Sequence, residues 1–322
     1  MEILELVKNC TRIGLTGHEN PDGDCTGACC GLALYLRKVL PEAIVDIYLE
    51  PPAENLIRNI PGADTIIYEV TGNEEKYDAF IVLDSAPSRV GKPLELYNRA
   101  GLKINIDHHR TNPGAGDTEC YIDGKASSAC ELVYKVIDRE EIDAQIAQAL
   151  YVGIVTDTGV FQYSNTSEST MRAAGSLMSY GFDHTAVIRE VFFERTPKQA
   201  RVLGTALIKA EPLLDGKLIL CCFDKKTMDE LGAGRKDLDG ISAQLLLTEG
   251  ADCSVFFHET EPGIWRASMR SLHVTDVSSI AAKHEGGGHL RAAGFTIRTD
   301  IHTAIKDITD DIAQQLRRAH VI

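Results

Sequence analysis

The chain lacks any long uninterrupted hydrophobic run. Hydrophobic residues make up 44% of its 322 positions, yet no stretch approaches the roughly 18 apolar residues that a membrane-spanning helix needs. The first residues also lack the basic start and the apolar core of a secretory signal. We therefore expect a cytoplasmic protein that has no membrane partner.

Basic residues are scarce relative to acidic ones. The chain has 33 Lys and Arg against 47 Asp and Glu, which gives a formal net charge of −14. Proteins that grip long nucleic acids normally carry a basic stripe that neutralises phosphates, and none is visible here. This balance argues against a long duplex as partner and is compatible with a small anionic substrate.

The cysteines show neither a disulfide framework nor zinc-site spacing. They number nine, which is odd, and no two are spaced as CxxC. This pattern is typical of small, mostly buried residues in a reducing compartment. Cys25, which directly follows Asp24, is the one cysteine that we consider a candidate for oxidation.

Strand-like and helix-like segments alternate through the first half of the chain. Apolar runs predict strands at 11–16, 44–49, 65–68, 79–83 and 103–106, and longer patterns predict helices at 25–39, 127–137 and 143–155. This alternation predicts an α/β fold class with a mostly parallel sheet flanked by helices. The strand runs show little polar alternation, so we expect central, buried strands.

The second half has a different pattern. From 167 to about 209 it is helical, and Thr196-Pro197 has the N-cap and first-turn proline of a new helix. Strands are then expected at 218–223, 253–258, 265–271 and 295–298, with helices at 277–284 and 301–320. We therefore divide the chain into a first domain over 1–195, a linker helix over 196–210 and a smaller mixed α/β domain over 211–322.

Four segments of the first domain carry acidic or imidazole side chains where we expect a strand to end or a helix to open. These side chains are His18, Asp22 and Asp24 after the first strand, Asp84 after 79–83, Asp107, His108 and His109 after 102–106, and Asp157 after Ile154-Val155. Strands of an α/β sheet deliver their chemistry at their carboxyl ends. The four segments are therefore predicted to converge.

Each of these residues alone has a simpler interpretation. An Asp at a strand end is usually a helix cap or a turn former, and His109 alone fits a core histidine bonded to a backbone carbonyl. Their co-occurrence favours a site for two hard divalent cations, with Mn²⁺ as first choice and Mg²⁺ as second. Two-metal sites hydrolyse phosphate esters.

With these motifs the sequence resembles the DHH phosphoesterase superfamily and, within it, the nanoRNase/pAp phosphatase (NrnA-type) group. The matching motifs are His18 to Asp24, Asp84, Asp107-His108-His109, Thr156 to Phe161, and Gly286-Gly287-Gly288-His289 with Ala292 to Phe295. The resemblance spans almost the whole chain. It implies a catalytic DHH domain over 1–195 and a DHH-associated substrate-binding domain over 211–322.

The resemblance implies a role for each matching residue of the first domain. His18, Asp22 and Asp84 would hold one metal, and Asp24, Asp84, His108 and Asp157 would hold the second, so that Asp84 bridges the two. Asp107 and His109 are the implied catalytic residues. Asp107 would orient an imidazole, and His109 would contact the scissile phosphate or protonate the leaving oxygen.

The glycine run of the second domain is a candidate substrate grip. Gly287 and Gly288 beside His289 allow backbone N–H groups to approach an anion, and we expect a helix to begin there and add its positive end. Arg270 and Arg291 are candidate partners of a terminal phosphate, because the guanidinium is a planar fork. An idle glycine loop and a solvated arginine are the simpler alternatives.

These observations together predict an enzyme, a metal-dependent hydrolase of phosphoester bonds. As the resemblance implies, its substrates would be very short oligoribonucleotides, 3′-phosphoadenosine 5′-phosphate or both, attacked by a hydroxide that two metals activate. Cleavage of cyclic or linear dinucleotides is an alternative, and a non-catalytic nucleotide-binding module is another. The physiological metal, the substrate preference, the polarity of cleavage and a homodimeric state stay open.

Overall fold

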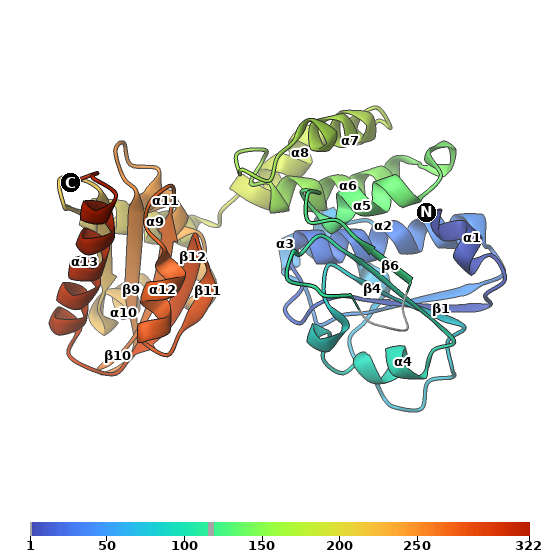
Figure 1. The fold of residues 1–322 in the computed structure, drawn as a ribbon, viewed down its shortest axis with the longest axis horizontal. Coiled ribbons are helices and arrows are strands. Elements are labelled where there is room, and N and C mark those ends of the chain that lie inside the picture. The colour runs from blue at the N-terminus through green and yellow to red at the C-terminus, as the bar shows by residue number, and fades with distance from the viewer. Residues whose placement is uncertain (1, 115–118) are drawn as a thin grey trace. The chain divides into compact units, whose positions relative to one another are not determined.

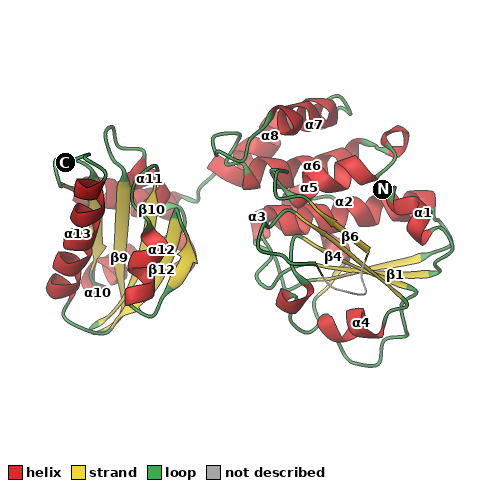
Figure 2. Cartoon of the chain, in the orientation of Figure 1, coloured by secondary structure: helices red, strands yellow, loops and turns green. Residues whose placement is uncertain are grey.

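The protein consists of two compact units. The boundary between them in the chain lies between Glu194 and Arg195. The computed structural model describes residues 2–114 and 119–322. Each unit is built around its own six-stranded sheet (Figures 1 and 2). The helix that we predicted as a linker is α9 (Pro197–Lys209). It belongs to the second unit, where Val202 and Ala206 are buried in the core.

The first sheet is parallel, with the strand order β3-β2-β1-β4-β5-β6. Its strands are β1 (Arg12–Thr16), β2 (Ile44–Tyr48), β3 (Ile66–Ile67), β4 (Ala79–Leu83), β5 (Leu102–Asp107) and β6 (Glu119–Ile122). The chain builds outward from β1 in one direction and from β4 in the other. Ligands of such sheets bind outside the carboxyl ends of the strands at this switch point, which lies between β1 and β4.

Helices cover both faces of this sheet. They are α1 (Ile3–Val7), α2 (Gly23–Val39), α3 (Glu54–Asn59), α4 (Leu94–Arg99), α5 (Ala129–Val136), α6 (Ala144–Asp157), α7 (Glu168–Met178) and α8 (His184–Ile188), which a π-helical turn over Arg189–Phe193 follows. The main core lies between the sheet and α2, α5 and α6, and a smaller cluster around Phe80 and Tyr97 lies under α4. The predicted fold class of this domain is confirmed.

The second sheet is mixed, with the order β11-β12-β10-β9-β8-β7. Its strands are β7 (Glu211–Leu213), β8 (Leu218–Phe223), β9 (Cys253–Glu261), β10 (Ile264–Ser271), β11 (Gly287–His289) and β12 (Ala292–Ile297). Within this second sheet, β8 and β9 are the only strands that pair in parallel among the described residues. The helices of this unit besides α9 are α10 (Lys225–Leu231), α11 (Ile241–Leu246), α12 (Val277–Lys283) and α13 (Ile301–Arg318). The smaller mixed α/β architecture is thus confirmed.

The two faces of the second sheet have separate cores. One core includes Val277 and Ile280 of α12 and Ile308 of α13, and the other includes Val202 of α9 and Leu245 of α11. In the part of the chain that the structure describes, no helix combines the length and the apolar content that crossing a bilayer requires.

The glycine run does not open a helix, so that prediction was wrong. Gly287–His289 forms β11 and pairs antiparallel with β12. Gly288 has a φ of 146°, and a Cβ built on it would lie 2.3 Å from the carbonyl oxygen of Ala292. The glycines therefore permit a tight strand pairing that a larger residue would block.

Candidate metal centre

The four predicted segments converge on one edge of the first sheet. His18 and the loop to α2 follow β1, Asp84 follows β4, and His108 follows β5. Asp157 is the exception to our expectation, because it closes helix α6 instead of ending a strand or opening a helix. The apolar pair before it, Ile154-Val155, lies in this buried helix, which agrees with the helix that we predicted over 143–155.

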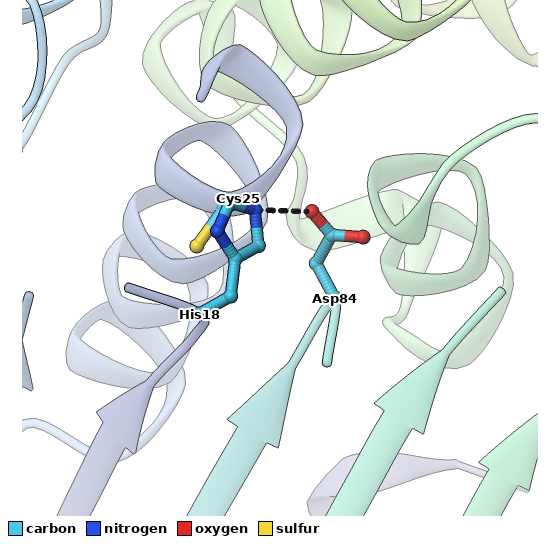
Figure 3. Close-up of side chains that lie close together, drawn as sticks. All are labelled: His18, Cys25 and Asp84. Carbon is cyan, nitrogen blue, oxygen red and sulfur yellow. Dashed lines mark ion pairs between the residues drawn. The ribbon is translucent and has the colours of Figure 1, made fainter. Parts of the chain in front are cut away.

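Asp84 and His18 form the first half of the centre. The Nε2 atom of His18 lies 3.4 Å from Oδ2 of Asp84 and 3.8 Å from Oδ1 of Asp22. Figure 3 shows the His18 and Asp84 side chains facing each other beyond the ends of adjacent strands. These two residues form one of the groups whose ligand atoms all lie within 4.8 Å of one another, and Cys25 is its third member.

Cys25 is a fully buried member of that group. Burial raises the pKa of its thiol well above the usual range. Reactive cysteines are exposed thiolates of lowered pKa. The structure therefore argues against the oxidation sensitivity that we considered for Cys25, and the carboxylate and imidazole remain the candidate ligands of this half.

The second half gathers around His108. Its Nε2 atom lies 3.2 Å from Oδ1 of Asp84, 3.8 Å from Oδ2 of Asp24 and 3.8 Å from Oδ2 of Asp157. Asp84 thus presents Oδ2 to His18 and Oδ1 to His108. A carboxylate with one oxygen toward each of two ligand groups has the arrangement of a metal-bridging residue.

The surroundings of Asp84 fit a cation. The side chain is only 3% exposed, and Oδ1 accepts no hydrogen bond from any described residue. A buried oxygen of this kind is unfavourable unless a partner is supplied. The backbone of Asp84 also has a φ of 56°, a left-handed conformation that non-glycine residues adopt mostly at functional sites. Carboxylates and imidazoles together suit Mn²⁺ or Mg²⁺.

The pKa values of the cluster reflect an excess of buried carboxylate charge. Burial lowers the pKa of His18, but the Asp22 and Asp84 carboxylates outweigh it and raise that pKa to about 12. Burial likewise lowers the pKa of His108, but the hydrogen bond with Asp84 and the nearby carboxylates outweigh burial and raise that pKa to about 10. Burial, with the neighbouring Asp84 carboxylate, raises the pKa of Asp157 to about 6. A bound divalent cation reverses this local pattern.

Asp24 is the most deeply buried acid of the cluster. Burial, followed by the charges of Asp84 and Asp157, raises its pKa well above the usual range. Its carboxylate also accepts hydrogen bonds from the backbone N–H groups of Ala129 at 2.6 Å and Cys130 at 2.9 Å, in the first turn of α5. Asp24 therefore fixes α5 against α2 and still points at His108.

Asp22 caps α2, as the simpler interpretation expects. Its Oδ1 accepts from the backbone N–H groups of Asp24 and Cys25, both at 3.0 Å. Its side chain is 60% exposed. Partial burial would raise the pKa of Asp22, but the hydrogen bond with His18 outweighs that effect and the pKa is lowered. The cap and the proximity to His18 are compatible, because a carboxylate has a second oxygen and several lone pairs.

His109 and Asp107 form a hydrogen-bonded pair beside the cluster. Nδ1 of His109 lies 2.7 Å from Oδ1 of Asp107 and 3.7 Å from Oδ1 of Asp84. The hydrogen bond with Asp107 raises the pKa of His109. Asp107 is fully buried, whereas the His109 side chain is 32% exposed. His109 is therefore an oriented, accessible imidazole that faces the same centre.

Three asparagines that we did not predict as site residues hold these groups in place. Asn112 donates to Oδ2 of Asp107 at 2.6 Å and to Oδ1 of Asn105 at 2.9 Å. Asn105 donates to the carbonyl of Ser85, next to Asp84, at 2.8 Å. Asn165 donates to Oδ2 of Asp157 at 3.3 Å. Only Asn105 carried a signal, as a polar residue inside an apolar strand.

The second unit brings Arg270 and His289 to the same end of its sheet. Both pair with Ala292 of β12, Arg270 from β10 and His289 from β11. Gly287, Gly288 and His289 are exposed. Arg291, by contrast, donates through its guanidinium to the backbone carbonyls of His273 and Thr275. These bonds hold a loop, so Arg291 has a structural role besides the predicted contact with substrate.

Comparison with known proteins covers both units. Residues 12–154 match the DHH family, N-terminal domain, and residues 216–318 match the DHHA1 domain. The bifunctional oligoribonuclease and PAP phosphatase NrnA of Thermus thermophilus is 32% identical over 99% of this chain and 94% of its own length. The Bacillus subtilis protein of the same name is 26% identical over 92% of each chain.

Solved structures share the fold. The crystal structure of an exopolyphosphatase-related protein from Bacteroides fragilis has a TM-score of 0.85 and 24% identity, and it covers 96% of this chain and 94% of its own. The crystal structure of the exonuclease RecJ bound to manganese has a TM-score of 0.51 and 16% identity, with 98% and 93% coverage. At these identities, the likeness concerns the fold alone.

Proposed function

The chain belongs to the DHH family, and from this premise we propose that it is a phosphoesterase that hydrolyses very short oligoribonucleotides and 3′-phosphoadenosine 5′-phosphate. The relatives from Thermus thermophilus and Bacillus subtilis are named for these two activities and match over nearly their whole length. The observation that carries the proposal is the buried Asp84 carboxylate, which presents one oxygen to His18 and the other to His108. End-wise cleavage of short RNA in the cytoplasm is part of the proposal.

Two divalent cations would be held by the clustered side chains. We assign His18, Asp22 and Asp84 to one cation and Asp24, Asp84, His108 and Asp157 to the other, with Mn²⁺ preferred and Mg²⁺ second. When bound, such cations supply an activated water and neutralise charge on the phosphoryl group. The raised pKa values of His18 and His108 support this assignment, because they show an excess of buried carboxylate charge.

His109 supplies the proton for the leaving oxygen. Asp107 engages Nδ1 at 2.7 Å, which leaves Nε2 as the atom that can hold and donate a proton. The hydrogen bond to Asp107 raises the pKa of His109, so the imidazolium form persists to a higher pH than in a free histidine. Asn112 fixes the far oxygen of Asp107 and thereby the orientation of the ring.

The second unit would bind the remainder of the substrate. Arg270 and His289 end on neighbouring positions of the sheet, and the N–H groups of Gly287 and Gly288 are accessible to an anion. Arg291 supports the loop beside them. A substrate of a few nucleotides suits such a small contact set better than a long duplex does.

The test is an assay of the purified chain with five substrates in Mn²⁺ or Mg²⁺. These are a ribodinucleotide, a five-nucleotide RNA, 3′-phosphoadenosine 5′-phosphate, a cyclic dinucleotide and pyrophosphate. We expect mononucleotide release from the dinucleotide and phosphate release from 3′-phosphoadenosine 5′-phosphate. Asp84→Asn should reduce both to the uncatalysed background, whereas Asp64→Asn, a change of an exposed acid outside the cluster, should leave both unchanged.

Two outcomes would contradict the proposal. One is full turnover by a folded Asp84→Asn protein, which would remove Asp84 from the reaction. The other is a clear preference for the cyclic dinucleotide or for pyrophosphate over both expected substrates. Circular dichroism of each variant establishes that the fold is retained.

A further inference from the structure

Asp157 lies at a helix end that disfavours a carboxylate. It is the last residue of α6, and the carboxyl end of a helix carries the negative pole of its dipole and carbonyl groups without helical partners. Oδ2 of Asp157 nevertheless lies 3.8 Å from Nε2 of His108, in the second half of the centre. The carboxylate therefore needs donors from outside the helix to stay in this position.

Asn165 supplies these donors. Its amide nitrogen lies 3.1 Å from the carbonyl oxygen of Asp157 and 3.3 Å from Oδ2 of the same residue. A third acceptor, the carbonyl oxygen of Ser127, lies 2.9 Å from this nitrogen. Three oxygens at one end of the amide fix its orientation, because only the NH₂ group of an asparagine side chain donates hydrogen bonds.

The contact with Ser127 connects Asp157 to the most deeply buried acid of the cluster. Ser127 directly precedes the start of α5, and the first turn of that helix donates two backbone N–H groups to Asp24. Asp24 and Asp157 each lie 3.8 Å from Nε2 of His108. Asn165 thus ties the end of α6 to the segment that holds Asp24, so one amide group links the positions of the two acids.

A rare backbone turn delivers Asn165 to this place. Gly159, Val160 and Phe161 are consecutive residues with φ values of 56°, 57° and 64°. This left-handed conformation is unfavourable for a residue with a Cβ atom, and most of all for a β-branched one such as valine. The buried hydroxyl of Thr158 accepts a hydrogen bond from the N–H of Phe161 at 3.1 Å. Strain of this kind persists only where neighbouring contacts impose it, and it is typical of functional sites.

Tyr163 packs onto the first residue of this turn. A Cβ built on Gly159 would lie 2.3 Å from Cζ of the Tyr163 ring. The backbone N–H of Tyr163 also donates to the carbonyl oxygen of Thr158 at 3.0 Å. The chain is therefore closely packed between the end of α6 and Asn165, and the position of the amide depends on this packing.

We propose that Asn165 is a positioning residue for the second cation, because it fixes the separation of Asp24 and Asp157 with the help of the left-handed turn. Its role rests on the proposed function, since the cation belongs to the metal centre assigned there. The three hydrogen bonds of its amide reach neither His18 nor Asp22 of the first half. Loss of the amide should therefore weaken one metal site and spare the other.

Isothermal titration calorimetry of the full chain with Mn²⁺ measures the number of sites and the affinity of each. We expect two sites in the wild type, and we expect Asn165→Ala to weaken the second about 10- to 100-fold without changing the first. Asn165→Leu keeps most of the side-chain volume but has no donor, so it should have the same effect. Asn98→Ala, which changes an exposed asparagine of α4, should leave both sites unchanged.

Electron paramagnetic resonance provides a second readout that does not depend on turnover. Two Mn²⁺ ions bridged by one carboxylate are magnetically coupled, whereas a single bound ion is not. We expect the coupled spectrum in the wild type and in Asn98→Ala. In Asn165→Ala, at a Mn²⁺ concentration that fills only the first site, we expect the spectrum of an isolated ion.

Two glycine variants test the turn. Gly159→Ala places a methyl group against Tyr163, and we expect it to weaken the second site at least about tenfold. Gly181→Ala is the matched control, because Gly181 also has a positive φ, of 86°, but no described atom lies within 4 Å of its new Cβ. Gly181→Ala should leave both sites unchanged. Equal weakening by the two variants would contradict the role of the turn.

Three results would overturn the role of Asn165. They are wild-type affinities at both sites in Asn165→Ala, equal weakening of both sites in that variant, and a wild-type chain that binds fewer than two Mn²⁺ ions. The outcome is separable from the test of hydrolysis. A second site that depends on Asn165 in a chain that hydrolyses none of the five substrates would refute the proposed function alone. An active enzyme whose two sites are intact in Asn165→Ala would refute the role of Asn165 alone.

Discussion

Asp84 combines three properties that a purely structural carboxylate does not need. Its backbone has a φ of 56°, its side chain is 3% exposed, and its Oδ1 lacks a hydrogen bond within the described residues. Each property costs folding free energy. The hydrogen bond from Asn105 to the carbonyl of Ser85 fixes the turn in which they occur. The protein therefore stabilises, through neighbouring residues, a carboxylate that becomes satisfied when a cation binds.

Asn112 is a positioning residue, and its replacement should affect catalysis more than binding. In Asn112→Ala, Asp107 loses the donor at 2.6 Å that helps to lower its pKa, and His109 loses its fixed partner. We expect kcat to fall about 10- to 100-fold with little change in KM. We also expect the alkaline limb of the pH–rate profile, which follows deprotonation of His109, to shift. Steady-state kinetics across pH 5–9 measures both effects.

Asn73→Ala is the matched control for Asn112→Ala, because Asn73 is an exposed loop residue outside the site. It should leave kcat and the pH profile unchanged. A merely structural role of Asn112 would lower the melting temperature without moving the pH profile. An Asn112→Ala enzyme with the wild-type kcat and pH profile would show that Asp107 and His109 need no such support.

At the scale of elements, the close contact of α2 and α6 brings Asp24 and Asp157 together. A Cβ built on Gly23 would lie 2.3 Å from Oγ1 of Thr156, and one built on Gly153 would lie 2.2 Å from Sγ of Cys130. The Gly153 Cβ would also lie 2.7 Å from Oδ1 of Asp24. The two helices therefore approach each other through glycines. The second half of the centre, around His108, depends on that approach.

Gly153→Ala should loosen this contact. The added methyl group must displace Cys130 or Asp24, so we expect the unfolding free energy to fall by about 1–3 kcal/mol and the affinity for Mn²⁺ to weaken. Urea unfolding and calorimetric titration with Mn²⁺ measure the two effects. The control is Gly175→Ala in α7, where no described atom lies within 4 Å of the new Cβ. An equal response of both variants would contradict the packing argument.

Glu131 holds the start of α5, and with it the helix end that binds Asp24. Its buried carboxylate accepts hydrogen bonds from Ser127, Ser169 and Thr170 and lies 2.7 Å from Nζ of Lys135. Burial alone would raise the pKa of Glu131, but these partners outweigh it and lower the pKa to about 2. The carboxylate therefore stabilises the fold above pH 4.5, and this contribution is lost as the pH falls through about 2.

Glu131→Gln should therefore destabilise the protein by about 3 kcal/mol at pH 7, from the difference between the two pKa values. The loss relative to wild type should shrink toward pH 3, where the wild-type carboxylate begins to lose its own contribution. Urea unfolding at the two pH values provides the measurement. Glu168→Gln, on the exposed surface of α7, should change stability by at most about 0.5 kcal/mol. A pH-independent deficit in Glu131→Gln would refute the electrostatic explanation.

Sequence patterns predicted the elements whose burial is visible in their own apolar residues. Central strands such as β4 and β5 were visible as apolar runs, because both of their faces are covered. The short edge strands β6, β7 and β11 were missed, because their exposed residues show no apolar pattern. The wrong expectation for the glycine run arose where strand pairing, not local sequence, determines the element.

The same reasoning explains what sequence revealed about the site. His18, Asp84 and His108 were identifiable, because ligand-type residues directly follow predicted strands. Asn112 and Asn165 were not identifiable, because their role is a hydrogen bond to a partner elsewhere in the chain. Sequence thus predicted the residue types that would hold a metal, and the structure adds the residues that position them.

At the scale of the whole molecule, an acidic protein concentrates several of its carboxylates in one buried cluster. The net charge is −14, and Asp24, Asp84 and Asp157 all lie within 4 Å of the His108 ring nitrogen Nε2. Without a cation, protons on His18 and His108 offset part of this charge, as their raised pKa values show. Folding stability and metal binding are therefore linked through these protons.

Metal binding should consequently stabilise the protein more strongly as the pH rises. In the metal-free state the pKa of His108 is raised to about 10, so its contribution to stability is complete below about 6.5 and is lost as the pH rises through 10. A bound cation instead requires neutral imidazoles and ionised carboxylates, including Asp157 with its pKa of about 6. The metal-free form thus weakens with rising pH, while the metal-bound form is favoured.

Melting curves in Mn²⁺ and in EDTA between pH 6 and 8.5 measure this linkage. At a free concentration about 100 times Kd, the cation stabilises by about 2.7 kcal/mol, which corresponds to about 5–10 °C for a unit of this size. We expect the difference between the two curves to widen with pH, and we expect Asp84→Asn to abolish it. A difference that is constant or narrows with rising pH would show that no proton leaves the cluster when the cation binds.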